Sequence, residues 1–291
     1  MNARLLGIGA VVAVAALALA GCSGGGKANP TSTGSAGAAT LRVVGKPFST
    51  ERYGVGLPLD TPNCAKVTQA IKDMIADGTW QAKLTSELTG VQYTPNAAKN
   101  PPADFEACGA GGTAAPVTAG KITIGIKFDQ PKLGFKQGDT YTGFDVDVAT
   151  YIAGKLGFTP DKIVWKESVS SQRETLLQNH QVDMIVATYS ITDARKAKVQ
   201  FAGPYFVAGQ DLLVKVANTS ITGPDSLDGK KLCSVTGSTP AQNIKDKYSK
   251  NVQLVEQTTY SECVQALKAD RVDAVTTDDI ILAGLAAASA G

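Results

Sequence analysis

Small polar residues follow four segments that the sequence predicts to be strands, ending near Ile126, Val186, Ser234 and Val275. In α/β sheets, ligands bind beyond the carboxyl ends of the strands, so these residues are the first candidates for chemistry. They are mostly small hydroxyls, with one base and two carboxylates: Lys127, Thr188, Ser190, Thr236, Gly237, Ser238, Thr239, Thr277, Asp278 and Asp279. Such a set can bind a small zwitterion through charge-assisted hydrogen bonds.

The same residues argue against several kinds of catalysis. We find no activated nucleophile with its base and no glycine-rich phosphate loop. His180 is the only histidine, so a histidine triad or a multi-histidine metal site is excluded, and we expect neither a metal nor another cofactor. The net charge of +2, without a long basic run, gives no argument for nucleic-acid binding.

Strands alternate with helices around these residues. Hydrophobic periodicity predicts strands at 121–126, 162–166, 182–187, 210–216, 231–234 and 272–276, and helices at 144–156, 171–179, 193–198, 240–248, 260–268 and 279–288. Gly157 stands where a helix C-terminus favours glycine, and Ser170 or Ser171 is expected to cap the 171–179 helix. The alternation predicts an α/β fold with mostly parallel sheets.

The first 22 residues have the features of an export signal. Arg4 precedes an apolar run at 5–20, which is shorter than the ~20 residues of a spanning helix and typical of a signal-peptide core. The run ends in LAGC, which resembles the lipobox of bacterial lipoproteins, where the cysteine, here Cys22, carries the lipid. The alternative is an ordinary signal peptide with a chance cysteine. Residues 23–40 are expected to form a flexible tether.

Four further cysteines suggest disulfides, because their number is even and an exported protein meets an oxidising compartment. Of the three possible pairings we favour Cys64–Cys108 and Cys233–Cys263, since each joins residues of one sequence region. Free buried thiols are the alternative. The spacings are not those of metal sites.

Motifs from residue 121 onward resemble the polar amino-acid family of extracytoplasmic binding proteins that serve ABC importers. In order, they are GFDVDVA (143–149), RETLL (173–177), VDMIVA (182–187), SITDAR (190–195), FAGPY (201–205), TGST (236–239) and VDAVTTD (272–278). IGIKFDQ (124–130) and LCSVTGST (232–239) are similar to the actinobacterial glutamate-binding branch. The resemblance implies a type II periplasmic-binding-protein-like fold, in which two α/β lobes joined by two hinge strands close on one amino acid.

The resemblance also implies roles for individual residues. Arg195 matches the arginine that grips the ligand α-carboxylate, and its planar fork suits a bidentate pair. Ser190 and Thr239 are expected to donate to the same carboxylate. Asp278 matches the acid that holds the α-ammonium, helped by the Thr188 region.

The remaining positions are expected to determine specificity. Lys127, Ser170 and Arg173 occupy positions that read the ligand side chain. Two cations in a closed cleft favour a carboxylate over an amide, because an unpaired buried charge is costly. We therefore expect glutamate, or aspartate, with glutamine, asparagine or another polar amino acid as the alternative. Either cation could instead face solvent. Gly237 and Ser238 complete the expected set, whereas Asp145 and Asp147 are expected to be structural.

The order of the segments departs from the family's. Residues 41–48 resemble the last strand of the second lobe, 53–58 the returning hinge strand and 67–80 the closing helix. This order predicts a circular permutant, with lobe one at 53–205, including the connector 95–120, and lobe two at 41–52 and 206–291. A truncated chain with a stray copy of the ending is the alternative. The hinge strands are expected near 53–59 and 206–214.

These expectations describe a monomeric lipoprotein outside the cytoplasm, anchored to the cell membrane, that captures an acidic amino acid and delivers it to an ABC permease. The alternatives are a periplasmic enzyme on the same fold and the sensing domain of a receptor. Against the enzyme, no catalytic carboxylate pair stands out; against the receptor, we find no second apolar run that could span a membrane.

Overall fold

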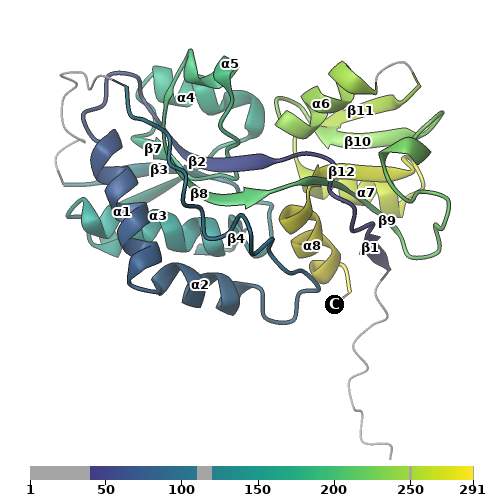
Figure 1. Cartoon of the computed structure of the whole chain (residues 1–291), viewed down its shortest axis with the longest axis horizontal. Coiled ribbons are helices and arrows are strands. Elements are labelled where there is room, and N and C mark those ends of the chain that lie inside the picture. Colours follow the sequence, from purple (N-terminus) through teal and green to yellow (C-terminus); the bar gives the residue numbers. More distant parts are fainter. Residues whose placement is uncertain (1–39, 110–119, 249–250, 291) are drawn as a thin grey trace, which may run out of the picture. The chain divides into compact units, whose positions relative to one another are not determined.

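The computed structural model describes residues 40–109, 120–248 and 251–290 (Figure 1). The predicted signal segment, the lipidation site Cys22 and all but the last residue of the tether lie outside these ranges. Within the ranges, no helix combines the length and the apolar character that crossing a membrane requires.

The first sheet has five strands in the order β1-β9-β12-β10-β11. Their bounds are β1 Leu41–Val43, β9 Gln210–Lys215, β12 Ala274–Asp278, β10 Lys231–Val235 and β11 Gln253–Gln257. Strand β10 is parallel to β11 and β12, whereas β9 is antiparallel to β12 and β1. With its helices we call it the first half: α6 Thr239–Lys247, α7 Tyr260–Lys268, α8 Asp279–Ala288 and a 3₁₀ turn at Pro224–Ser226.

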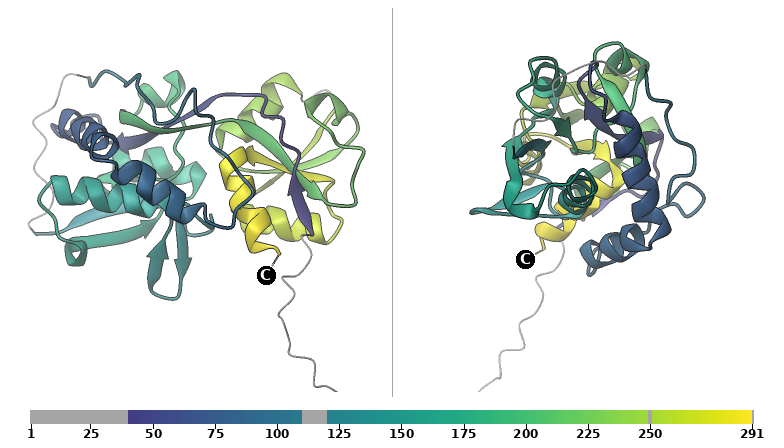
Figure 2. Two further views of the ribbon diagram at one scale, coloured as in Figure 1. Left: turned by 60° about the horizontal axis from the view of Figure 1, so that its bottom comes forward. Right: turned by 90° about the vertical axis from the view of Figure 1, so that its left-hand side faces the viewer.

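The second sheet has the order β6-β3-β7-β2-β8, with β6 Ile163–Glu167, β3 Ile122–Ile126, β7 Met184–Ile185, β2 Glu51–Leu57 and β8 Gln200–Ala208. The elements packed around it complete the second half: α1 Cys64–Ala76, α2 Thr79–Glu87, α3 Phe144–Lys155, α4 Arg173–Gln178, α5 Asp193–Lys196, the hairpin β4 Phe135–Gln137 and β5 Thr140–Thr142, and 3₁₀ turns at Pro160–Lys162 and Ser170–Gln172. Figure 2 shows the blue helices α1 and α2 on its outer side.

Two chain segments cross between the halves, and we call them the crossing strands. One runs through β8 into β9 with only Gly209 between them, and the other runs from β1 into β2. Figure 1 shows β2 and β8 side by side where they pass between the sheets, and they pair antiparallel. Because β9 joins β1 to β12, the early residues 41–43 lie in the same sheet as residues 274–278 near the other end of the sequence.

The expectation of mostly parallel sheets is wrong, because each sheet is mixed. A parallel pair needs a long crossover connection, usually a helix. The crossing strands have none: β9 runs antiparallel to β12 and β2 runs antiparallel to β7, so each sheet contains both strand directions.

Local expectations were met to different degrees. Helix α3 ends before Gly157, whose φ of +94° fits a helix terminus. The predicted caps Ser170 and Ser171 are wrong: a 3₁₀ turn holds both and leads directly into α4, whose cap is Gln172 without a side-chain bond. Strand β7 is shorter than predicted, and β11 and the β4–β5 hairpin were not predicted.

The early helices are part of the core of the second half. Trp80 on α2 donates from Nε1 to the Tyr205 carbonyl at 2.7 Å, and its ring stacks on Phe206 at 6.3 Å. Phe144 of α3 meets the same indole edge-on at 5.7 Å. Residues 64–87 are therefore integral to the fold.

Both expected disulfides are confirmed. Cys64–Cys108 joins the start of α1 to the connector, and Cys233–Cys263 joins β10 to α7. They span 44 and 30 residues, so the chain-entropy account gives each roughly 3–4 kcal/mol of stabilisation.

Candidate functional site

Most of the expected ligand-binding residues line one cavity between the two halves. Its walls contain Ser170, Arg173, Thr188, Ser190, Ser238, Thr239 and Asp278, together with Pro240, Tyr260 and Ile281. The cavity measures only about 10 Å³, which is room for about one water molecule. The halves are closely apposed here: a Cβ on Gly237 would lie 2.8 Å from Ser171 Cα. An amino acid can enter only if side chains or halves move.

Arg195 connects the two halves. Its Nη1 donates to the Ser190 carbonyl at 2.8 Å and to Thr239 Oγ1 at 2.9 Å, and its Nη2 donates to the Gly237 carbonyl at 3.0 Å. Its Nε lies 3.2 Å from Glu174, a partner that the sequence reasoning missed. A ligand carboxylate would therefore replace acceptors that the protein itself supplies.

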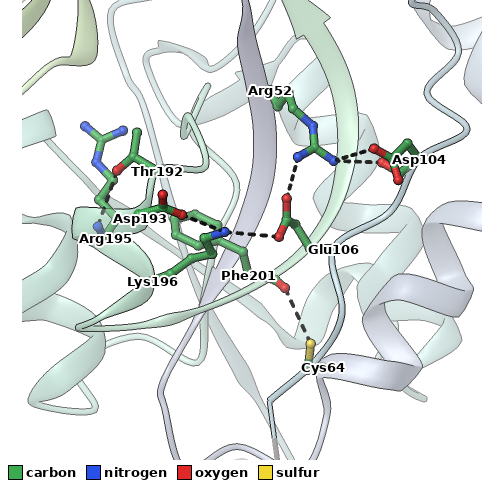
Figure 3. A network of polar contacts seen from close by, with 9 residues as sticks. All are labelled: Arg52, Cys64, Asp104, Glu106, Thr192, Asp193, Arg195, Lys196 and Phe201. Carbon is green, nitrogen blue, oxygen red and sulfur yellow. Dashed lines mark hydrogen bonds and ion pairs between the residues drawn. The ribbon is translucent and has the colours of Figure 1, made fainter.

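The short helix that carries Arg195 is tied to a crossing strand. Lys196, the next residue on α5, pairs with Glu106 at 3.4 Å, and Glu106 also pairs with Arg52 on β2 (Figure 3). Thr192 caps α5 by accepting from the Arg195 backbone N–H. Glu106, which lies in the connector, thus fixes the position of α5 against β2.

Arg173 is almost fully buried, at 2% exposure. Its Nε donates to the Ser170 carbonyl at 3.3 Å and its Nη1 to the Ala187 carbonyl at 3.1 Å. Its guanidinium lies 4.2 Å from the centre of the Tyr189 ring, a cation–π arrangement. Burial, and then the charge of Arg195, lower the pKa of Arg173 to about 10.

Lys127 is buried at 1% exposure, and its Nζ has no hydrogen-bond partner among the described residues. The nearest aromatic group is Tyr260, whose ring centre lies 5.7 Å away. Burial lowers the pKa of Lys127 to about 8, and Asp129 partly opposes this effect. The alternative that Lys127 or Arg173 faces solvent is therefore wrong.

Asp278 ends β12 and is 2% exposed. Its Oδ2 accepts from the Tyr53 hydroxyl at 2.6 Å, whereas its Oδ1 has no partner among the described residues. Burial, and then the charge of Glu51, raise the pKa of Asp278 well above its ordinary value. Tyr53 lies on β2, so a crossing strand holds this acid in place.

Thr188 is held in an uncommon backbone conformation, with φ of +45°. Its backbone N–H donates to Asp145 Oδ2 at 2.9 Å, and the Tyr205 hydroxyl donates to Asp145 Oδ1 at 2.8 Å. Burial raises the pKa of Asp145 to about 6. Asp145 is thus fully used by the protein, as its expected structural role requires.

The remaining expected residues have different positions. Ser238 caps α6 by accepting from the Ala241 N–H at 3.1 Å, so part of its bonding capacity is used. The sequence reasoning missed Tyr53, Tyr260 and Glu174. Tyr260 begins a helix that was predicted, but its place in the cavity depends on the unpredicted strand β11. In the described ranges, no cluster of His, Cys, Asp or Glu could hold a metal ion.

Sequence comparisons agree with this geometry. Residues 122–235 match the family described as bacterial extracellular solute-binding proteins, family 3. The glutamate-binding protein GluB of Corynebacterium efficiens is 48% identical over 184 residues, which are 61% of this chain and 62% of that protein. The glutamine-binding protein of Geobacillus stearothermophilus is 40% identical over 57% of this chain and 64% of its own length. The chain thus matches less than two thirds of either relative.

A solved structure extends the match. An ancestral arginine-binding protein bound to glutamine is similar with a TM-score of 0.53 and 37% identity, over 57% of this chain and 72% of that one. The fold is thus of the type II periplasmic-binding-protein kind, built from mixed sheets. The cavity between the two halves agrees with these matches, and the chain belongs to the bacterial extracellular solute-binding proteins, family 3.

Proposed function

We propose that this protein binds an acidic amino acid, glutamate above aspartate, in the cavity between its halves and delivers it to an ABC permease. The observation that carries this proposal is the pair of buried cations, Lys127 and Arg173. Lys127 Nζ has no partner among the described residues, and Arg173 donates to backbone carbonyls rather than to a carboxylate.

A ligand side-chain carboxylate would satisfy both cations. A buried charge without a partner costs several kcal/mol, and a charge-assisted hydrogen bond recovers part of that cost. The oxygen of a neutral amide can accept hydrogen bonds but cannot balance two positive charges. The proposal therefore ranks glutamate above glutamine, although relatives of both names are similar to this chain.

Other polar groups of the site would bind the α-ammonium and the α-carboxylate, which all amino acids share. Asp278 Oδ1 offers a free acceptor for the α-ammonium. Arg195, with Ser190 and Thr239 beside it, offers donors for the α-carboxylate. We propose that ligand binding draws the halves together around these groups, without any chemical step.

Delivery to a permease and anchoring through a lipidated Cys22 are carried over from the family and the lipobox resemblance. In this proposal, lobe one is 53–205 and lobe two is 41–52 with 206–291, in an order permuted relative to the family. The crossing strands serve as the hinge.

The decisive experiment is calorimetry on the protein that begins after Cys22, titrated separately with glutamate, aspartate, glutamine and arginine. We expect submillimolar or tighter binding of glutamate, weaker binding of aspartate and still weaker binding of glutamine. No heat with glutamate or aspartate, together with clear binding of glutamine or arginine, contradicts the proposed specificity.

A further inference from the structure

Asp129 joins the two halves at a point outside the predicted ligand contacts. It lies in the loop 127–134, directly after β3 of the second half. Its Oδ2 accepts from the backbone N–H groups of Tyr260 at 2.7 Å and Ser261 at 3.3 Å. These are the first two residues of α7, which packs on β10 in the first half.

The contact completes the N-terminus of α7. The first four N–H groups of a helix lack partners within the helix. A capping box provides for two of them: Thr259 Oγ1 accepts from Glu262 N–H at 3.3 Å, and Glu262 Oε2 accepts from Thr259 N–H at 2.9 Å. The other two belong to Tyr260 and Ser261 and reach Asp129. The negative carboxylate also complements the positive end of the helix dipole.

The same loop touches a second helix of the first half. A Cβ on Gly284 of α8 would lie 2.2 Å from the Pro131 carbonyl oxygen, so only glycine permits this approach. The loop itself is held to its own half, since Phe144 N–H donates to the Lys132 carbonyl at 2.8 Å and Asp145 N–H to the Leu133 carbonyl at 3.1 Å. It therefore moves with the second half.

The loop is also connected to the cavity. Tyr260, whose backbone N–H donates to Asp129, lines the cavity wall, and Nζ of Lys127, the first residue of the loop, lies 5.7 Å from the centre of the Tyr260 ring. We propose that loop 127–134 is a closure latch, in which Asp129 grips the N-terminus of α7 when the halves meet and so slows escape of the ligand. This inference rests on the proposed function, because it assumes that a ligand is retained by closure. Asp129 acts as a positioning residue and needs no contact with the ligand.

The first test compares glutamate binding by the wild type, Asp129→Ala and Asp129→Asn, using calorimetry for Kd and stopped-flow fluorescence for koff. We expect Asp129→Ala to raise Kd about tenfold, mainly through koff, because two charge-assisted bonds of the closed form are lost. Asp129→Asn should have a smaller effect, since its amide oxygen can still accept but carries no charge. Asp139→Asn, on the exposed tip of the β4–β5 hairpin, is the matched control and should change nothing.

The second test includes a measurement without ligand, and that measurement is independent of the proposed specificity. Amide exchange of Tyr260 and Ser261, followed by NMR, should be faster in Asp129→Ala than in the wild type, both without ligand and at saturating glutamate. Thr259 still caps α7 in this variant, and retained shift dispersion would show that it folds. Equal exchange in both proteins, or an unchanged glutamate Kd in Asp129→Ala, overturns the latch. If the wild type binds no glutamate, the proposed function fails, and the exchange rates of the ligand-free proteins still decide the latch.

Discussion

The groups proposed to contact the two ends of the ligand differ in how their charges are paired. For the end that all amino acids share, the protein supplies carboxylate and hydroxyl partners: Tyr53 donates to Asp278 Oδ2, and Glu174 pairs with Arg195, so that only Asp278 Oδ1 lacks a partner among the described residues. For the side-chain end, neither Lys127 nor Arg173 meets an acid within hydrogen-bonding distance among the described residues. The shared end is thus partly paired already, whereas the side-chain end carries two positive charges that a ligand carboxylate can balance. By the proposed function, the shared end recognises any amino acid and the side-chain end selects acidic ones.

The largest effect should come from the shared end. Arg195→Ala removes the donors proposed for the α-carboxylate and leaves Glu174 without its partner. We expect the affinity for every amino acid to fall by about 1,000-fold, which corresponds to about 4 kcal/mol. Calorimetry measures this loss, and Lys198→Ala, at an exposed position just after the same helix, is the control. Retained glutamate affinity in Arg195→Ala would break the comparison at the shared end.

A selective effect should come from the other end. Arg173→Gln removes one buried cation but keeps a side chain that can donate hydrogen bonds. We expect glutamate affinity to fall about tenfold while glutamine affinity stays constant or rises, so the ratio of the two dissociation constants is the measurement. Equal losses for both ligands would show that Arg173 supports the cavity without reading the side chain.

Lys127→Met should weaken binding least of the three variants, and it should make the folded protein more stable. We expect glutamate to bind several-fold more weakly, because Arg173 remains, while the free energy of unfolding at pH 7 rises by on the order of 2 kcal/mol. The pKa of Lys127 is about 8 when folded and ordinary when unfolded, so between pH 8 and 10.5 the unfolded chain binds more protons. The free energy of unfolding of the wild type should therefore increase as the pH rises from 8 to 10.5.

Urea unfolding followed by circular dichroism at several pH values measures this gain. The Lys127→Met variant lacks the titrating group and is the control. If the difference in unfolding free energy between the two proteins is the same at pH 7 and pH 10, Lys127 is not an uncompensated charge in the folded protein.

Local sequence patterns predicted the polar residues of the cavity better than their partners. Residues after Ile126 and Val186 lie near one another because β3 and β7 are neighbours in one sheet, and Asp278, after Val275, lines the same cavity as Thr188 because the two halves meet there. Which acid pairs with Arg195, however, depends on the packing of α4 against α5. Periodicity says nothing about this packing, so it could not predict Glu174 as the partner of Arg195.

The mixed sheets were missed for a related reason. Alternation of strands and helices favours parallel sheets, but strand direction depends on which distant segments pair. The resemblance to a known family predicted strands within residues 41–58, where the structure has β1 and β2, and the periodicity of the residues did not. The bonds of Asp129 to α7 are equally invisible in the sequence, since 131 positions separate Asp129 from Tyr260.

The crossing strands have a mechanical consequence. Asp278 pairs with Gln210 at the start of β9 and receives the Tyr53 hydroxyl from β2, so it lies beside both strands that pass between the halves. If the halves turn about these strands, Asp278 stays near the pivot and is displaced little. A ligand bound there by its ammonium would be captured first at a fixed point. The second half would then turn and bring the remaining contacts onto the ligand, including those of Lys127 and Arg173.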